Sequence, residues 1–209
     1  MSQINIFGEE EVNRNVVNPG KNLYENAELH FYPDFIPTEK SNHFFEVLLS
    51  KIEWKQEGMK MYGKTVNFPR LTAWYGDSDK PYSFSGITLH PLEWTNELLN
   101  IQQQLLIKTG LQFNSVLLNR YRNGNDSISW HSDGERELGQ NPTIASVNFG
   151  EARTFELKHN TSGETITVVL PHGSMLLMAG ETQHFWKHRV AKTSKPVKER
   201  INLTFRILK

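Results

Sequence analysis

Residues 200–206 read Arg-Ile-Asn-Leu-Thr-Phe-Arg, and apolar and polar side chains alternate along them without a break. This pattern predicts a β-strand, because successive side chains of a strand point to opposite faces of the sheet. One face is apolar, and the other carries Arg200, Asn202, Thr204 and Arg206. In a barrel this second face is buried, so its two arginines need anionic or polar partners inside the fold.

Similar short runs fill the chain beyond Gly110. They are rich in Val, Ile, Phe and Thr and are separated by turn residues: FNSVLLNRY, SISWHSD, TIASVNFG, RTFELKH, TITVVLP and GSMLLMAG. Apolar residues at helical spacing predict two helices before them, from Thr38 to about Ile52 and from Pro91 to near Gly110. Together these elements predict an α+β fold built on an antiparallel sandwich or jelly roll.

The composition narrows the chemistry that the chain can perform. Its 209 residues include no cysteine, which excludes disulfides, thiolate nucleophiles, iron–sulfur clusters and Cys-type zinc sites. Any bound metal must therefore have His, Asp or Glu ligands. Lys plus Arg and Asp plus Glu are balanced at 23 each, so the net charge does not indicate a nucleic-acid partner.

No stretch is long and apolar enough for a membrane span, and the first residues lack a signal-peptide pattern. We therefore expect no membrane partner and a cytoplasmic protein, or a nuclear one if the host is eukaryotic. The polar, Asn-rich residues 1–27 predict an irregular arm, and residues 28–209 a single domain. Within it, about residues 55–90 are rich in aromatics and carry a hairpin signal at Gly63-Lys64, which indicates a lid or binding surface.

The tripeptide His131-Ser132-Asp133 is a candidate metal site. If residues 127–133 form a strand, His131 and Asp133 share one face and can meet a single ion. Two His and one carboxylate form the open site of the non-haem Fe(II) oxygenases. A third ligand must come from elsewhere, and spacing does not choose among His159, His172, His184 and His188. The alternative is that the tripeptide is a surface turn.

The paired arginines indicate what else such a site binds. At strand rise their Cα atoms are about 20 Å apart, but long guanidinium side chains can converge on a short dicarboxylate. The run 113–121 places Asn119 and Tyr121 on one strand face, where an amide and a phenol can bind the same small acid. This need for a dicarboxylate favours a metal site over a surface turn.

Five features occur in order along the second half of the chain: Asn119-Arg120-Tyr121, Gly124, His131-x-Asp133, a late His, and Arg200 paired with Arg206. Together they resemble the AlkB family of iron and 2-oxoglutarate dependent dioxygenases. The surrounding segments ERELG, IASVNFG, HGSMLLM and RINLTFR are most similar to the branch with the animal AlkB-type DNA repair homologues. The resemblance covers about residues 60–208. It implies a double-stranded β-helix (jelly-roll) core over about residues 111–208, preceded by helices and a nucleotide-recognition lid.

The resemblance implies three cofactors and co-substrates: Fe(II), 2-oxoglutarate and O2. The iron ligands would be His131, Asp133 and His188, since the family places its second His 12 residues before the first paired arginine, as here. The 2-oxoglutarate pocket would contain Asn119, Tyr121, Arg200, Thr204 and Arg206. Arg200 would pair with the distal carboxylate, and Arg206 would lie near the keto-acid end and Asp133.

The resemblance also implies a nucleic-acid partner. The activity would be oxidative dealkylation of 1-methyladenine and 3-methylcytosine in alkylated DNA, or in RNA, by a monomer that releases formaldehyde, succinate and CO2. The resemblance assigns several residues to the nucleic acid, as a finger that inserts into the duplex, a phosphate contact, a wall of the base pocket and contacts to the base. These residues are Tyr62, Gly63, Lys64, Arg70, Tyr82, Ser83, Phe84, Gly134 and Glu135. Relatives often have Asp at the position of Gly134, and this departure bears on base preference.

Two other classes of function fit parts of the sequence. A metal-dependent hydrolase could use the same His and Asp ligands with a zinc-bound water, but it gives the paired arginines no role. A catalytically silent barrel could recognise damaged nucleic acid by stacking alone, and it would form neither succinate nor formaldehyde.

Overall fold

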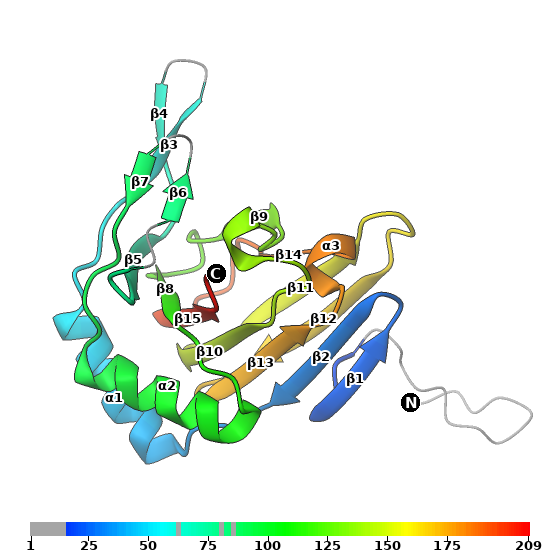
Figure 1. The fold of residues 1–209 in the computed structure, drawn as a ribbon, viewed down its shortest axis with the longest axis horizontal. Helices are drawn as coiled ribbons and strands as arrows, with labels where there is room; N and C mark the ends of the chain where they lie inside the picture. The colour runs from blue at the N-terminus through cyan, green and yellow to red at the C-terminus, as the bar shows by residue number, and fades with distance from the viewer. Residues whose placement is uncertain (1–15, 62–63, 80–81, 85–86) are drawn as a thin grey trace, which may run out of the picture.

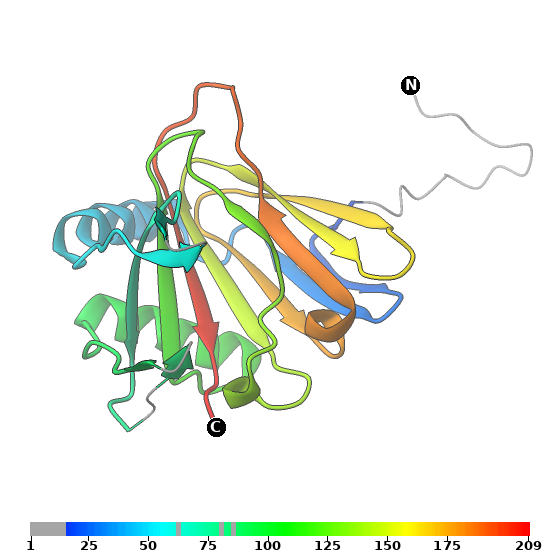
Figure 2. The ribbon, with the colours of Figure 1, turned by 90° about the horizontal axis from the view of Figure 1, so that it is seen from above.

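Two antiparallel β-sheets face each other in the computed structural model, which describes residues 16–61, 64–79, 82–84 and 87–209 (Figures 1 and 2). The major sheet runs in the order β1 (Gly20–Tyr24), β2 (Ala27–Tyr32), β13 (Ser174–Ala179), β10 (Ile144–Gly150), β15 (Arg200–Arg206), β8 (Ser115–Tyr121) and β5 (Leu71–Gly76). The minor sheet runs β12 (Thr165–Leu170), β11 (Arg153–His159), β14 (Trp186–Val190) and β9 (Ile128–His131). This double-layered antiparallel arrangement confirms the predicted α+β class with a jelly-roll core.

Two helices cover the outer face of the major sheet, α1 (Thr38–Lys51) and α2 (Asn96–Thr109) (Figure 1). The side chain of Thr95 caps α2 by accepting from the backbone N–H of Leu98, and Gly110 ends the helix in a left-handed conformation with φ 73°. Helix α1 begins at Thr38 as predicted, but Pro37 rather than Thr38 occupies the cap position. Both helices bury apolar side chains against the sheet, which leaves the opposite face of that sheet turned toward β9, β11, β12 and β14.

Strand β15 lies in the middle of the major sheet, and its two faces have different surroundings. Ile201, Leu203 and Phe205 are fully buried in the core shared with the helices. The four alternate polar residues line a cavity between the sheets. The alternation in the sequence therefore predicted both faces correctly, and it places Arg200 and Arg206 on the inside.

The N-terminal segment corrects one prediction. Residues 20–24 belong to β1, which pairs antiparallel with β2, so the predicted irregular arm is wrong for this part of residues 1–27. The pairing satisfies backbone hydrogen bonds along an edge of β2 that would otherwise be open, a benefit that local composition does not reveal. In the turn before β2, the backbone carbonyl of Glu25 accepts a hydrogen bond of 2.8 Å from the indole N–H of Trp186. This bond connects the segment to the strand that carries His188.

Two small two-stranded sheets project from one end of the molecule (Figure 1). They are formed by β3 (Gly58–Met61) with β4 (Lys64–Asn67), and by β6 (Tyr82–Phe84) with β7 (Ile87–Leu89). The pairing of Met61 with Lys64 agrees with the hairpin predicted at this point. Neither α1 nor α2 nor any shorter helix in the described ranges has the length and apolar character needed to cross a bilayer.

Candidate active site

Three potential metal ligands meet between the two sheets. Ligand atoms of His131, Asp133 and His188 all lie within 4.8 Å of one another, and they form the one such group within the described ranges. His131 is the last residue of β9 and pairs directly with His188 on β14, so the sheet register sets the separation of the two imidazoles. Their ring centroids are 4.2 Å apart. The fold thus selects His188 from the four downstream histidines.

Asp133 joins this group from a loop. Strand β9 ends at His131, so the predicted strand over residues 127–133 is wrong at its C-terminal end. The backbone N–H of Asp133 donates to the side-chain oxygen of Gln183 at 2.8 Å instead of to a neighbouring strand. Gln183 is buried in the short helix α3 (Thr182–Phe185), five residues before His188. One amide therefore connects the segments that carry two of the three ligands.

The charge state of the group suits a divalent cation. Asp133 is only 3% exposed, and burial alone would raise its pKa, but Arg206 and the two histidines lower it below the ordinary value. Arg206 also donates to the Asp133 carboxylate at 2.7 Å. Burial lowers the pKa of His188 to about 3, which keeps its imidazole neutral. The Nδ1 atom of His131 lies 2.8 Å from the Ser129 carbonyl, which leaves Nε2 as its ligand atom.

A cavity adjoins these ligands. It brings together eight residues that the sequence singled out: Asn119, Tyr121, His131, Asp133, His188, Arg200, Thr204 and Arg206. They come from four strands and one loop, so only the folded chain collects them. The cavity combines a metal-ligand group at one place with cationic and polar donors at another.

Arg200 shows which kind of ligand this cavity fits. The residue is 1% exposed, and its Nη2 atom donates to the Asn148 side-chain oxygen at 2.6 Å. Its Nε and Nη1 atoms are buried and have no hydrogen-bond partner among the described residues. A buried guanidinium with unused donors is costly unless an anion completes its contacts. A carboxylate is the ligand that matches this donor geometry.

Sequence reasoning did not identify Asn148 and Gln183 as residues of this site, and it assigned no role to Asn202. The side-chain oxygen of Asn148 accepts a hydrogen bond from Arg200. Asn202 was placed on the polar face of its strand but was not assigned to the pocket. The side-chain NH2 group of Asn202 donates to the Ser146 hydroxyl at 2.8 Å. The signal for Asn148 was available, because Ser146 and Asn148 alternate with apolar residues on β10 as the polar residues do on β15. No comparable signal exists for Gln183, since its role depends on a contact with a segment fifty residues away.

We expect Gln183→Leu to weaken metal binding by about 10- to 100-fold, the usual cost of losing an outer hydrogen bond to a metal-ligating segment. The substitution removes the acceptor of the Asp133 N–H group but keeps a buried side chain of similar size. Titration of the purified protein with Mn²⁺ measures the effect, and Gln140→Leu, at an exposed position, is the matched control. Equal affinities for the Gln183→Leu variant and the wild type would show that this amide does not position Asp133.

The structure describes the positions of only some of the predicted substrate-binding residues. Gly134 is exposed and Glu135 half-buried directly after Asp133, and a Cβ atom at Gly134 would approach no atom closer than 3.8 Å. A side chain at Gly134 therefore has room. Arg70 points to Asn119 rather than to solvent, with a distance of 2.8 Å from Nε to Oδ1. Tyr62 and Gly63 lie outside the described residues, as do the side chains of Lys64, Tyr82, Ser83 and Phe84.

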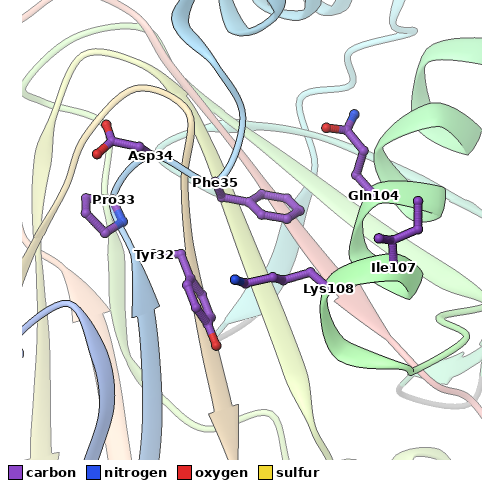
Figure 3. A pocket seen from close by; sticks show the side chains of 7 residues that line it. All are labelled: Tyr32, Pro33, Asp34, Phe35, Gln104, Ile107 and Lys108. Carbon is purple, nitrogen blue, oxygen red and sulfur yellow. The ribbon is translucent and has the colours of Figure 1, made fainter.

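The remaining candidate histidines serve local structure. Nδ1 of His172 accepts from the backbone N–H of Gly150, and Nδ1 of His159 accepts from that of Ser162. A second hollow lies on the helix side of the major sheet, between the end of β2 and α2, where Tyr32, Phe35 and Lys108 point toward one another (Figure 3). Its lining contains one carboxylate and no histidine, so it does not offer a metal site.

The sequence pattern of the 2OG-Fe(II) oxygenase superfamily matches residues 28–206, a span that includes every ligand described above. The chain belongs to this superfamily. Members use Fe(II), 2-oxoglutarate and O2. In this chain, the group of His131, Asp133 and His188 fits Fe(II), and the buried Arg200 fits a carboxylate of 2-oxoglutarate. The predicted membership of the oxygenases and the predicted cofactors are therefore confirmed.

Within the superfamily, the similar proteins are AlkB-type enzymes. Alpha-ketoglutarate-dependent dioxygenase alkB homolog 3 of Bos taurus is 42% identical over 184 residues, which cover 83% of this chain and 64% of that protein. DNA oxidative demethylase ALKBH2 of Homo sapiens is 38% identical over 180 residues, 82% of this chain and 66% of that protein. The chain thus spans just under two thirds of these relatives. A solved structure titled "The structure of OsALKBH1" shares the fold, with TM-score 0.62, 15% identity and coverage of 91% and 99% of the two chains.

Proposed function

We propose that this chain removes alkyl groups oxidatively from N-alkylated bases of DNA, with 1-methyladenine and 3-methylcytosine as substrates. RNA carrying the same lesions is a second candidate substrate. The observation that carries the proposal is the single cavity that joins a His-Asp-His group to a buried arginine with unused donors. The names of the relatives, a dioxygenase and a DNA oxidative demethylase, support the reaction and the nucleic acid.

In this proposal, His131, Asp133 and His188 hold Fe(II), and Asn119, Tyr121, Arg200, Thr204 and Arg206 bind 2-oxoglutarate. With O2, the bound metal and 2-oxoglutarate would supply the oxidant: one oxygen atom of O2 would enter the alkyl carbon as a hydroxyl group, and the other would enter succinate as CO2 leaves. Arg206 keeps Asp133 ionised, and Arg200 neutralises the distal carboxylate. The hydroxylated methyl group then leaves as formaldehyde, and the base nitrogen is restored.

The base must leave the helical stack to reach so enclosed a site. We assign the lid, about residues 55–90, to this recognition step, with Tyr62, Gly63, Lys64, Tyr82, Ser83 and Phe84 as its contacts. Gly134 and Glu135, which follow the ligand Asp133 directly, would lie beside the flipped base. A monomer suffices, since all these residues come from one chain. The hydrolase alternative is disfavoured because it leaves the donors of Arg200 without a ligand.

The test is mass spectrometry of oligonucleotides that carry 1-methyladenine or 3-methylcytosine. They are incubated with the protein, Fe(II), ascorbate and 2-oxoglutarate, as DNA and as RNA, and formaldehyde and succinate are measured in parallel. We expect loss of the methyl mass with one formaldehyde and one succinate per repaired base. Survival of both lesions in DNA and RNA while 2-oxoglutarate is consumed would contradict base repair but not the oxygenase. Loss of methyl groups without O2 would contradict the oxygenase itself.

A further inference from the structure

Arg70 lies between β4 and β5, where the lid joins the major sheet, and its side chain is turned toward the cavity wall. Its Nε atom donates to the side-chain oxygen of Asn119 at 2.8 Å. The guanidinium carbon also lies 5.1 Å from the centre of the Phe68 ring, within cation–π range. Arg70 is half-buried, and through Asn119 its guanidinium contacts the wall of the cavity.

The contact determines how the amide of Asn119 is oriented. Arginine carries only donors, so Asn119 must present its oxygen to Arg70 and its NH2 group to the other side. Asn119 is 3% exposed and lines the cavity. A carboxylate or keto oxygen in the cavity can only accept hydrogen bonds, so it can pair with the NH2 group of Asn119 but not with its oxygen. The orientation that Arg70 imposes is therefore the one that suits an oxo acid.

Two neighbouring amides on the same wall follow this rule. The side-chain oxygen of Asn148 accepts from Arg200 at 2.6 Å and from Asn202 at 3.1 Å. The oxygen of Asn202 accepts from the Thr204 hydroxyl at 3.1 Å. With Asn119 held by Arg70, all three amide oxygens are occupied by protein donors. Each of these amide oxygens therefore already accepts from at least one protein donor.

We propose that Arg70 is a positioning residue for the 2-oxo acid, which it serves by fixing the amide of Asn119 with its NH2 group toward the cavity. The inference rests on the proposed 2-oxoglutarate site. Without Arg70 the amide can rotate by about half a turn, because the last torsion of Asn has two broad minima. In the rotated state its oxygen would face the anion. Since Arg70 belongs to the lid, 2-oxoglutarate binding and the position of the lid are coupled through this bond.

The test is calorimetric titration of the Mn²⁺-loaded full chain with 2-oxoglutarate in the absence of nucleic acid. We expect Arg70→Met to weaken binding about tenfold, as for the loss of one charge-assisted hydrogen bond. Arg70→Lys, which keeps a cationic donor, should recover part of the affinity. Lys158→Met, which removes an exposed cation from β11, is the matched control and should bind like the wild type.

A double-mutant cycle separates Arg70 acting through Asn119 from Arg70 acting alone. Asn119→Ala should weaken binding, and adding Arg70→Met to it should cause no further loss. Additive losses of affinity in the double mutant would overturn the proposal. It would also be overturned if Arg70→Met bound 2-oxoglutarate like the wild type but bound methylated DNA more weakly, because Arg70 would then be a phosphate contact. Failure of the wild type itself to bind 2-oxoglutarate would overturn the proposed function, and with it the role of Arg70.

Discussion

Replacement of Arg200 by methionine is expected to weaken 2-oxoglutarate binding by at least about 100-fold while leaving the ligand-free protein as stable as the wild type or more so. Burial lowers the pKa of Arg200, which shows how unfavourable its surroundings are to the charge. Two of its nitrogen atoms have no partner among the described residues, so the free protein bears the cost of desolvating them. Methionine removes that cost and fills most of the volume, and the replacement of buried ionic groups by apolar side chains of similar volume is often neutral or stabilising by about 1–4 kcal/mol.

Urea unfolding with and without 2-oxoglutarate measures both effects in the Mn²⁺-loaded protein. At a ligand concentration 100 times the dissociation constant, the wild type should gain about 2.7 kcal/mol in free energy of unfolding. At the same ligand concentration the Arg200→Met variant should gain no more than about 0.4 kcal/mol, because its weaker binding leaves it at most half-saturated. Arg120→Met is the matched control, since Arg120 pairs with Glu199 on the opposite face of the same sheet and should not affect the ligand response. Retained ligand stabilisation in Arg200→Met would show that the distal carboxylate binds elsewhere.

Asp133→Asn is expected to abolish turnover and to weaken metal binding by more than the roughly 100-fold typical of losing an outer contact. The substitution keeps the shape of the side chain but removes the one anionic ligand of the group. It also replaces the charged acceptor of the Arg206 hydrogen bond with a neutral one. Formaldehyde release from methylated oligonucleotides and titration with Mn²⁺ give the two measurements.

The control for this substitution is Glu137→Gln, which removes a carboxylate four residues further along, in the 3-10 helix η1 (Arg136–Leu138). It should retain both metal affinity and turnover. If Asp133→Asn bound Mn²⁺ as tightly as the wild type, the metal would have to bind outside the His131, Asp133 and His188 group.

The sequence alone determined the features that depend on neighbouring residues. Alternation along residues 200–206 was sufficient to assign the two faces of β15, because side-chain direction in a strand has a period of two. The residue composition restricted any metal to His, Asp or Glu ligands before a site was known. Local signals also gave the extent of α1 and the C-terminal end of α2, since caps and apolar spacing act over one or two turns, but α2 begins at Asn96 and not directly after Pro91 as predicted.

The tertiary structure decided what depends on segments far apart in the chain. Spacing left four histidines open as the third ligand, and only the pairing of β14 with β9 sets His188 against His131. The same is true of Gln183 and Arg70, whose partners lie about fifty residues away. A hydrogen bond between distant segments leaves no periodicity in the sequence, because each residue meets its partner only after the chain has folded.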